Sequence, residues 1–86
     1  MIDLFLDMMS AERGASPNTL SAYRRDLDLC AAQLATFGQD LPTAGQGHLE
    51  AVLGAWAKQG LAASTAARRL SSLKQFYKFL QIEGLR

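Results

Sequence analysis

The chain has 86 residues, enough for one small domain whose secondary-structure elements share a single hydrophobic core. Hydrophobic residues make up 49% of the sequence, which argues against disorder, and no apolar run approaches the roughly 20 residues that a membrane-spanning helix needs. The single cysteine, Cys30, excludes an internal disulfide, and the net charge of +1 does not by itself indicate a nucleic-acid partner.

The first helix is predicted over residues 2–13. Apolar residues recur at helical spacing from Ile2 to Met9, and Arg13 followed by Gly14 is typical of a helix end. The segment carries three acids and has no basic leader, so it does not resemble a signal peptide. Together with the lone cysteine, this favours a cytoplasmic protein with no membrane partner.

The second helix is predicted over residues 17–37. Ser16 is a suitable N-cap and Pro17 a suitable first helical residue. A stripe of apolar residues then runs along one face from Leu20 to Leu34. The proline and glycines that follow predict that the longest loop of the chain comes next.

The third helix is predicted over residues 47–59, where Val52 and Trp56 belong to the apolar face, and the fourth over residues 64–83. Ser64 is the expected N-cap of the fourth helix. Its buried face is expected to contain Ala66, Leu70, Leu73, Tyr77 and Leu80. No segment alternates as a strand does, so the predicted fold class is all-α, a four-helix bundle forming a single domain over residues 1–86.

No pattern of catalytic or metal-binding residues is visible. The only histidine, His48, lies near the start of the third helix, where a surface or capping role is far more common than general-base catalysis. Cys30, Tyr23 and Tyr77 all fall on apolar stripes and are expected to be core residues. We therefore expect this chain to have no catalytic residue, no cofactor and no metal.

The distribution of charge is more informative than its sum. From Ser64 to Arg86 there are five basic residues and one acid, whereas residues 1–13 hold three acids and one arginine. This asymmetry suggests one basic face, although ordinary solvated helix surface remains the alternative.

On the fourth helix, the side opposite the predicted core carries a line of hydrogen-bonding and basic side chains and no acid. Thr65, Arg68, Ser72 and Gln75 cluster there, with Arg69 and Lys74 toward the flanks. A helix of this kind can lie in the major groove of DNA, where Arg and Gln read base edges while Ser and Thr bind phosphates.

The second helix presents a similar set of residues away from its apolar stripe, and both helices begin with hydroxyl side chains. Capping of the helix and contact with a phosphate are equally good explanations for these hydroxyls. The residues predicted to contact DNA are Asn18, Thr19, Arg24, Arg25, Ser64, Thr65, Arg68, Arg69, Ser72, Lys74 and Gln75. Replacing both Arg68 and Arg69 by alanine is expected to weaken binding without unfolding the domain.

Phe79 does not fit the predicted core of the fourth helix, because it points away from the apolar stripe, and Ile82 lies close to that side. Either the end of this helix is buried on two sides, or both residues contact a second domain or another subunit.

Two sequence runs resemble a known family. Residues 16–27, SPNTLSAYRRDL, resemble the S-x-x-T-L-x-x-Y-x-x-D-L opening of tyrosine recombinases and phage integrases. Residues 64–80, STAARRLSSLKQFYKFL, resemble the fourth-helix segment of the same family. The two runs occur in the expected order and spacing, and the similarity is greatest to the bacterial Xer type.

The resemblance implies an N-terminal core-binding domain, a SAM-like orthogonal bundle of four helices. In that family the second and fourth helices approach the major groove, and a C-terminal domain, absent from this sequence, carries the catalytic residues. The implied partners are a double-stranded recombination site, the catalytic domain and other protomers in a synaptic tetramer, with the isolated domain a monomer. The implied processes are DNA recombination and integration. The alternative is a free-standing helical protein-interaction module.

Overall fold

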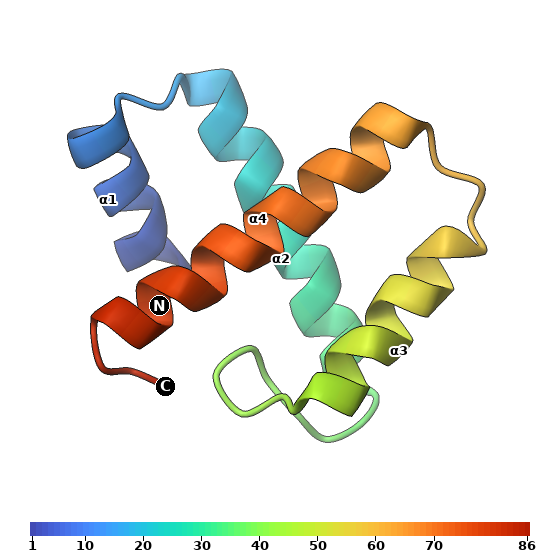
Figure 1. The fold of residues 1–86 in the computed structure, drawn as a ribbon. Coiled ribbons are helices and arrows are strands. Elements are labelled where there is room, and N and C mark those ends of the chain that lie inside the picture. Colours follow the sequence, from blue (N-terminus) through green and yellow to red (C-terminus); the bar gives the residue numbers. More distant parts are fainter.

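The computed structural model describes all 86 residues and contains four helices and no strand, as predicted. The helices are α1 (Ile2–Arg13), α2 (Pro17–Ala35), α3 (Gln46–Ala57) and α4 (Ala63–Ile82). Figure 1 shows α4 crossing α2, with α1 on one side of the crossing and α3 on the other. No helix combines the length and apolar character needed to cross a membrane.

The junction between α1 and α2 follows the predicted capping signals. Gly14 ends α1 in the left-handed conformation, at φ 61°, where a side chain would be strained. The Ser16 hydroxyl accepts a hydrogen bond from the backbone N–H of Thr19 at 3.2 Å, and Pro17 is the first residue of α2. The N-cap predicted at Ser16 is confirmed, and its hydroxyl is already engaged by the helix.

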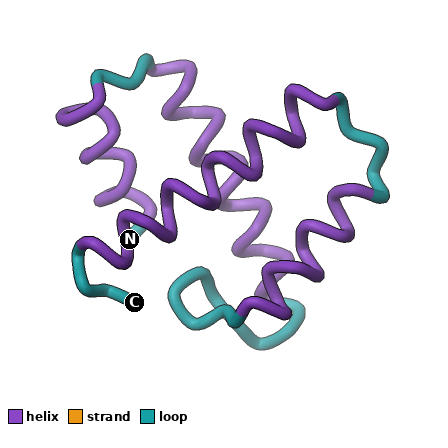
Figure 2. The backbone as a smooth tube through the Cα atoms, viewed as in Figure 1, coloured by secondary structure: helices purple, strands orange, loops and turns teal.

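The predicted end of α2 at residue 37 was two residues too late. The helix ends at Ala35, because the N–H groups of Thr36 and Phe37 bond to carbonyls three residues back and Gly38 then adopts φ 72°. The loop that follows is the longest in the chain, as predicted, and Figure 2 shows it folding back below α3.

Two capping assignments had different outcomes. His48 has the capping role expected for it, since its Nδ1 accepts the backbone N–H of Gly45 at 3.0 Å. The N-cap predicted at Ser64 is wrong: the N-cap is Ala62, whose carbonyl accepts the N–H of Ala66 at 3.0 Å. Ser64 therefore lies inside the first turn of α4 and is exposed.

The core lies where the four helices converge. Phe5 from α1 is fully buried, with its ring centroid 5.4 Å from that of Phe76 in an edge-to-face arrangement. Cys30 is also fully buried, and burial raises the pKa of its thiol to about 11, so it is the inert core thiol that was predicted. The buried apolar residues are Phe5, Leu6, Met9, Leu27, Cys30, Leu34, Leu41, Ala44, Val52, Trp56, Leu73, Phe76, Phe79 and Leu80.

The predicted orientation of α4 about its own axis was wrong. Leu73 and Leu80 are buried as expected, but Leu70 and Ala66 are exposed, while Ser72 is fully buried. The buried side of α4 is thus turned by about a quarter of a turn from the predicted stripe, at 3.6 residues per turn. This rotation follows from the position of α4, whose inner side faces α2 and α1 as well as α3.

The same rotation explains why Phe79 is buried. One of the two interpretations of the sequence was that the end of this helix is buried on two sides. Phe79 is 7% exposed, and its ring centroid lies 5.6 Å from that of Phe5. Ile82, in contrast, is 71% exposed. The two residues that the sequence grouped together therefore have different environments.

We predict that Phe79→Ala lowers the free energy of unfolding by about 3 kcal/mol, because it leaves a cavity against Phe5. Ile82→Ala is the matched control on the same turn of α4 and should change stability by about 0.5 kcal/mol or less. Urea denaturation followed by circular dichroism measures both values. Equal effects of the two substitutions would contradict the packing of α4 described above.

Candidate nucleic-acid interface

The crossing of α2 and α4 is built around a buried carboxylate. Asp26 of α2 is fully buried, and both of its oxygens accept hydrogen bonds from Arg68 of α4. Arg68 Nε lies 3.0 Å from Oδ2, and Nη2 lies 2.8 Å from Oδ1. This two-point contact fixes the plane of the guanidinium relative to the carboxylate. The same hydrogen bonding raises the pKa of Arg68, so its side chain stays charged.

Ser72 and Arg69 complete this group. Ser72 was predicted to face DNA, but it is fully buried, and its hydroxyl lies 3.3 Å from Asp26 Oδ2 and 2.9 Å from the Arg69 carbonyl. The predicted role of Ser72 is therefore wrong, because the rotation of α4 turns this side chain toward α2. We call Asp26, Arg68, Arg69 and Ser72 the crossing cluster.

Arg69 is largely enclosed, with only 13% of its side chain exposed. Its Nε lies 3.7 Å from Asp26 Oδ1 and has no hydrogen-bond partner. Its guanidinium lies over the ring of Trp56 of α3, 5.0 Å from the centroid. Two arginines thus face one carboxylate, which leaves one excess positive charge in the crossing cluster.

Gln75 also takes part in contacts between helices. Its side-chain amide nitrogen lies 3.0 Å from the hydroxyl of Tyr23 and 3.0 Å from that of Ser71. Its carbonyl oxygen accepts a hydrogen bond from Arg13 of α1 at 3.2 Å. Gln75 was predicted to present free hydrogen-bonding groups to DNA, but in the structure these groups join α4 to α1 and α2.

Two further basic residues lie away from the crossing cluster. Arg24 forms an exposed ion pair with Asp3 of α1, and Arg24 lowers the pKa of that carboxyl by hydrogen bonding and by its charge. Lys74 lines a groove between α3 and α4 together with Leu53 and Leu70. The predicted DNA-contacting residues therefore do not form one continuous surface.

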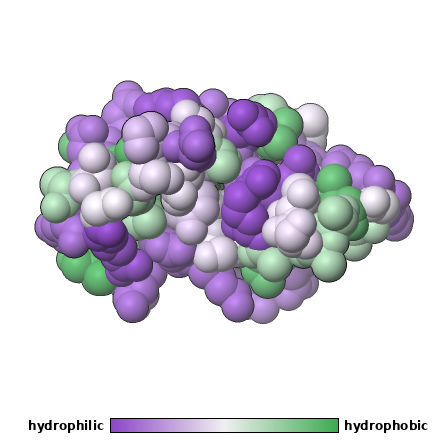
Figure 3. Space-filling view, turned by 90° about the horizontal axis from the view of Figure 1, so that it is seen from above, coloured by the Kyte–Doolittle hydropathy of each residue, from purple (hydrophilic) through white to green (hydrophobic).

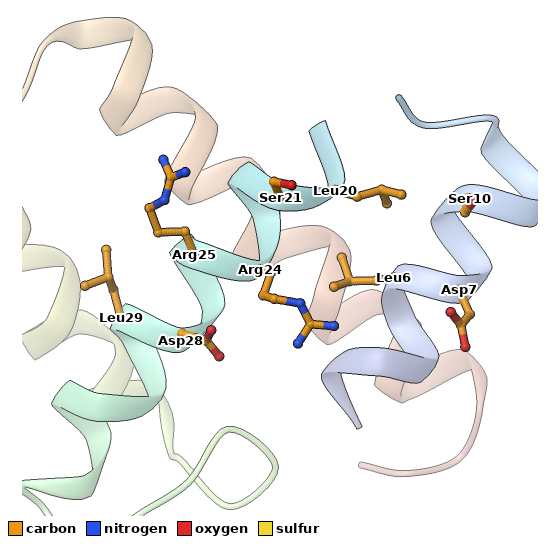
Figure 4. A pocket seen from close by; sticks show the side chains of 9 residues that line it. All are labelled: Leu6, Asp7, Ser10, Leu20, Ser21, Arg24, Arg25, Asp28 and Leu29. Carbon is orange, nitrogen blue, oxygen red and sulfur yellow. The ribbon is translucent and has the colours of Figure 1, made fainter. Parts of the chain in front are cut away.

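The residues that remain available lie on the first half of α2 and the first turns of α4. Arg25 is exposed and has no hydrogen bond or ion pair, and Figure 4 shows its side chain extending away from α1, whereas Arg24 points toward it. The side chain of Arg68 is 36% exposed despite its contact with Asp26. The other members are Asn18, Thr19, Ser64 and Thr65, of which Asn18 and Ser64 are exposed and Thr19 and Thr65 half-buried.

The beginnings of α2 and α4 lie at the top of Figure 1, the side that Figure 3 shows, where hydrophilic surface is interrupted by paler and apolar patches. At the beginning of α2, Pro17 has no N–H and the N–H groups of Thr19 and Leu20 bond to Ser16, so only the backbone N–H of Asn18 is left free for an anion. No group of His, Cys, Asp or Glu side chains is arranged to hold a metal ion. The chemistry available at this surface is therefore hydrogen bonding and the binding of anions.

Sequence reasoning did not identify Asp26, although a signal for it was present. Asp26 lies three residues after Tyr23 and four residues before Cys30, so it falls on the same stripe as those two core residues. An acid in such a position requires a basic partner on a neighbouring helix.

We predict that Arg68→Ala destabilises the domain by about 2–3 kcal/mol, because it removes two hydrogen bonds from a buried carboxylate. Arg25→Ala removes the same charge from the same region and should change stability by about 0.5 kcal/mol or less. Urea denaturation distinguishes the two. The double replacement of Arg68 and Arg69 by alanine, expected from the sequence to leave the domain folded, would remove both cations that face Asp26. Equal stability of Arg68→Ala and Arg25→Ala would contradict the predicted cost.

Residues 2–84 match the family model described as the phage integrase N-terminal SAM-like domain. The tyrosine recombinase XerD of Brucella abortus biovar 1 (strain 9-941) is 53% identical over 85 residues, which cover 99% of this chain and 28% of that protein. The tyrosine recombinase XerC of Erythrobacter litoralis (strain HTCC2594) is 49% identical, with coverage of 99% and 26%. No solved structure matches the chain significantly.

The chain thus spans little more than a quarter of the length of these relatives, from 26% to 28%. It corresponds to one helical domain of these proteins. The resemblance seen in the two sequence runs is confirmed over nearly the whole chain. The chain belongs to the family of phage integrase N-terminal SAM-like domains, in the form found in Xer tyrosine recombinases.

Proposed function

We propose that this chain binds double-stranded DNA in a sequence-specific manner, as the N-terminal domain of a tyrosine recombinase that acts in DNA recombination. The observation that carries the proposal is the 53% identity to a tyrosine recombinase over 99% of the chain. The exposed cations on neighbouring parts of α2 and α4 give the proposal a physical basis, because phosphate neutralisation dominates DNA affinity.

The proposed contacts follow from which side chains are accessible. Arg25 is a free cation and supplies phosphate binding, while Arg68 offers its exposed N–H groups to a phosphate or to a guanine edge. Asn18 and Thr65 provide shorter hydrogen-bonding groups, and Thr19 and Ser64 lie beside the helix N-termini. Arg69 contributes charge from behind this surface, since most of its side chain is enclosed.

The parts of a recombinase that cut and rejoin DNA would be supplied outside these 86 residues. In that arrangement the domain holds one side of the target duplex while a catalytic domain acts on it. Its further partners would be other recombinase protomers in a synaptic tetramer, at a recombination site in the cytoplasm. The domain itself performs no chemistry in this proposal.

One observation favours a protein-interaction function instead. Leu4, Ile82 and Leu85 are 59%, 71% and 43% exposed, and Leu4 and Leu85 line the same shallow depression beside Phe79. Exposed apolar groups gathered in this way are typical of contact with another protein. A domain with this function alone would show no salt-dependent binding to DNA.

We predict that the 86-residue chain binds a recombination-site duplex weakly and that its affinity falls as salt rises. Arg25→Ala should lower the affinity about threefold to tenfold and reduce the slope of log K against log salt by about 0.9, the value for one phosphate contact. Fluorescence anisotropy with a labelled duplex, repeated across a salt series, measures both quantities.

Lys58→Ala is the matched control, because Lys58 is an exposed cation that follows α3 and is not one of the proposed contacts. It should leave the salt slope unchanged. If Lys58→Ala and Arg25→Ala reduced binding equally, the basic residues would act only through net charge and the proposed surface would be wrong. If the wild-type chain bound no duplex even at low salt, the DNA-binding function would be wrong.

A further inference from the structure

We infer that Asp26 is a positioning residue for DNA binding, whose buried carboxylate holds the guanidinium of Arg68 in the orientation that meets the duplex. This inference rests on the proposed function and adds to it a residue that does not touch DNA. An acid is the least expected residue under a DNA-binding surface, because its charge repels phosphate. The basic residues around Asp26 offset this repulsion.

The contact with Asp26 leaves part of Arg68 free. An arginine has five N–H donors, and Asp26 accepts one from Nε and one from Nη2, so three donors remain. The side chain of Arg68 is 36% exposed, whereas that of Asp26 is fully buried. The carboxylate therefore lies behind the arginine, and the free edge of the guanidinium is the part that faces solvent.

The other members of the crossing cluster fix the carboxylate itself. The single O–H of Ser72 is shared between the Arg69 carbonyl at 2.9 Å and Asp26 Oδ2 at 3.3 Å, so it adds a weaker third contact to the two hydrogen bonds that Asp26 accepts from Arg68. Arg69 Nε lies 3.7 Å from Oδ1, and the contact of Arg69 with Trp56 keeps this second cation in place. The two arginines outweigh the single carboxylate, so the cluster presents a net positive charge to a phosphate.

Fixing a flexible side chain before binding reduces the entropy that binding must otherwise remove. A free arginine on a helix samples many rotamers, whereas the two-point contact restricts Arg68 to one plane. A structural role alone requires only that Asp26 be neutralised. A positioning role requires in addition that the direction of the Arg68 guanidinium affect DNA affinity.

The two roles make opposite predictions for Asp26→Asn. The substitution raises the net charge from +1 to +2, so if charge alone mattered the domain would bind DNA more tightly. If Asp26 positions Arg68, the folded variant should bind the recombination-site duplex about threefold to tenfold more weakly. Its preference for that duplex over a scrambled sequence should also decrease.

Asp28→Asn is the matched control, because Asp28 is an exposed acid two residues further along α2 and the charge change is identical. It should bind as tightly as the wild-type chain or more tightly. All affinities are measured by anisotropy at a temperature where circular dichroism shows each variant folded.

A second variant keeps the test decisive if Asp26→Asn does not fold. Arg68→Lys retains the positive charge beside Asp26 but cannot make the two-point contact. It should weaken binding to a similar degree while leaving the salt slope unchanged, because the number of neutralised phosphates stays the same. A loss of stability without a change in affinity would indicate a structural role only.

The outcomes separate the inference from the proposed function. If the wild-type chain binds the duplex and Asp26→Asn, or Arg68→Lys in its place, binds equally well or more tightly, the positioning role is overturned and the DNA-binding function stands. If the wild-type chain shows no salt-dependent binding, both are overturned. Weaker binding of the folded variant, with Asp28→Asn unaffected, supports the inference.

Discussion

The structure depends on one buried carboxylate at the point where α2 and α4 cross. Asp26 is fully buried, and its oxygens accept hydrogen bonds from Arg68 and Ser72, while Arg69 lies close to the same group. A buried charge without such partners would be strongly unfavourable, so the carboxylate constrains both the rotation of α4 about its axis and its position along α2. The contact between Arg69 and Trp56 extends this constraint to α3.

Because of this constraint, the polar side chains of α4 serve two purposes. Ser72 is fully buried and the side-chain amide of Gln75 is hydrogen-bonded to α1 and α2, so both hold the helices together, whereas Arg68 holds α2 and remains more than one-third exposed. The proposed DNA-binding surface is therefore what remains after the helix contacts are satisfied, and it is smaller than a helical wheel suggests. Arg25 is the one predicted arginine that is exposed and free of any partner.

The sequence was sufficient to predict that the chain forms four helices, and local signals fixed the junction of α1 and α2, although the predicted end of α2 and the N-cap predicted at Ser64 were wrong. Ser16, Pro17 and Gly14 act within one turn of the chain, and the structure confirms each of them. The side of α4 that is buried could not be predicted in the same way. A helical wheel allows two buried sides for α4, one with Leu70 and Tyr77 and one with Ser72 and Phe79. Which side is buried depends on contacts with α1 and α2, which lie far away in sequence. The burial of Asp26 was readable from its spacing to Tyr23 and Cys30, but its partner on α4 was not.

The most direct measurement is a nuclear magnetic resonance titration of the ¹⁵N-labelled chain with a recombination-site duplex, following backbone amides and the Nε–H group of Arg68. The account predicts a protected Arg68 Nε–H signal in the free domain, because Asp26 accepts that proton. On addition of DNA, this signal and the amides around Arg25 should shift, while those of α3 should not. The account would be contradicted if the Arg68 signal were absent from the free domain, or if α3 shifted and Arg68 did not.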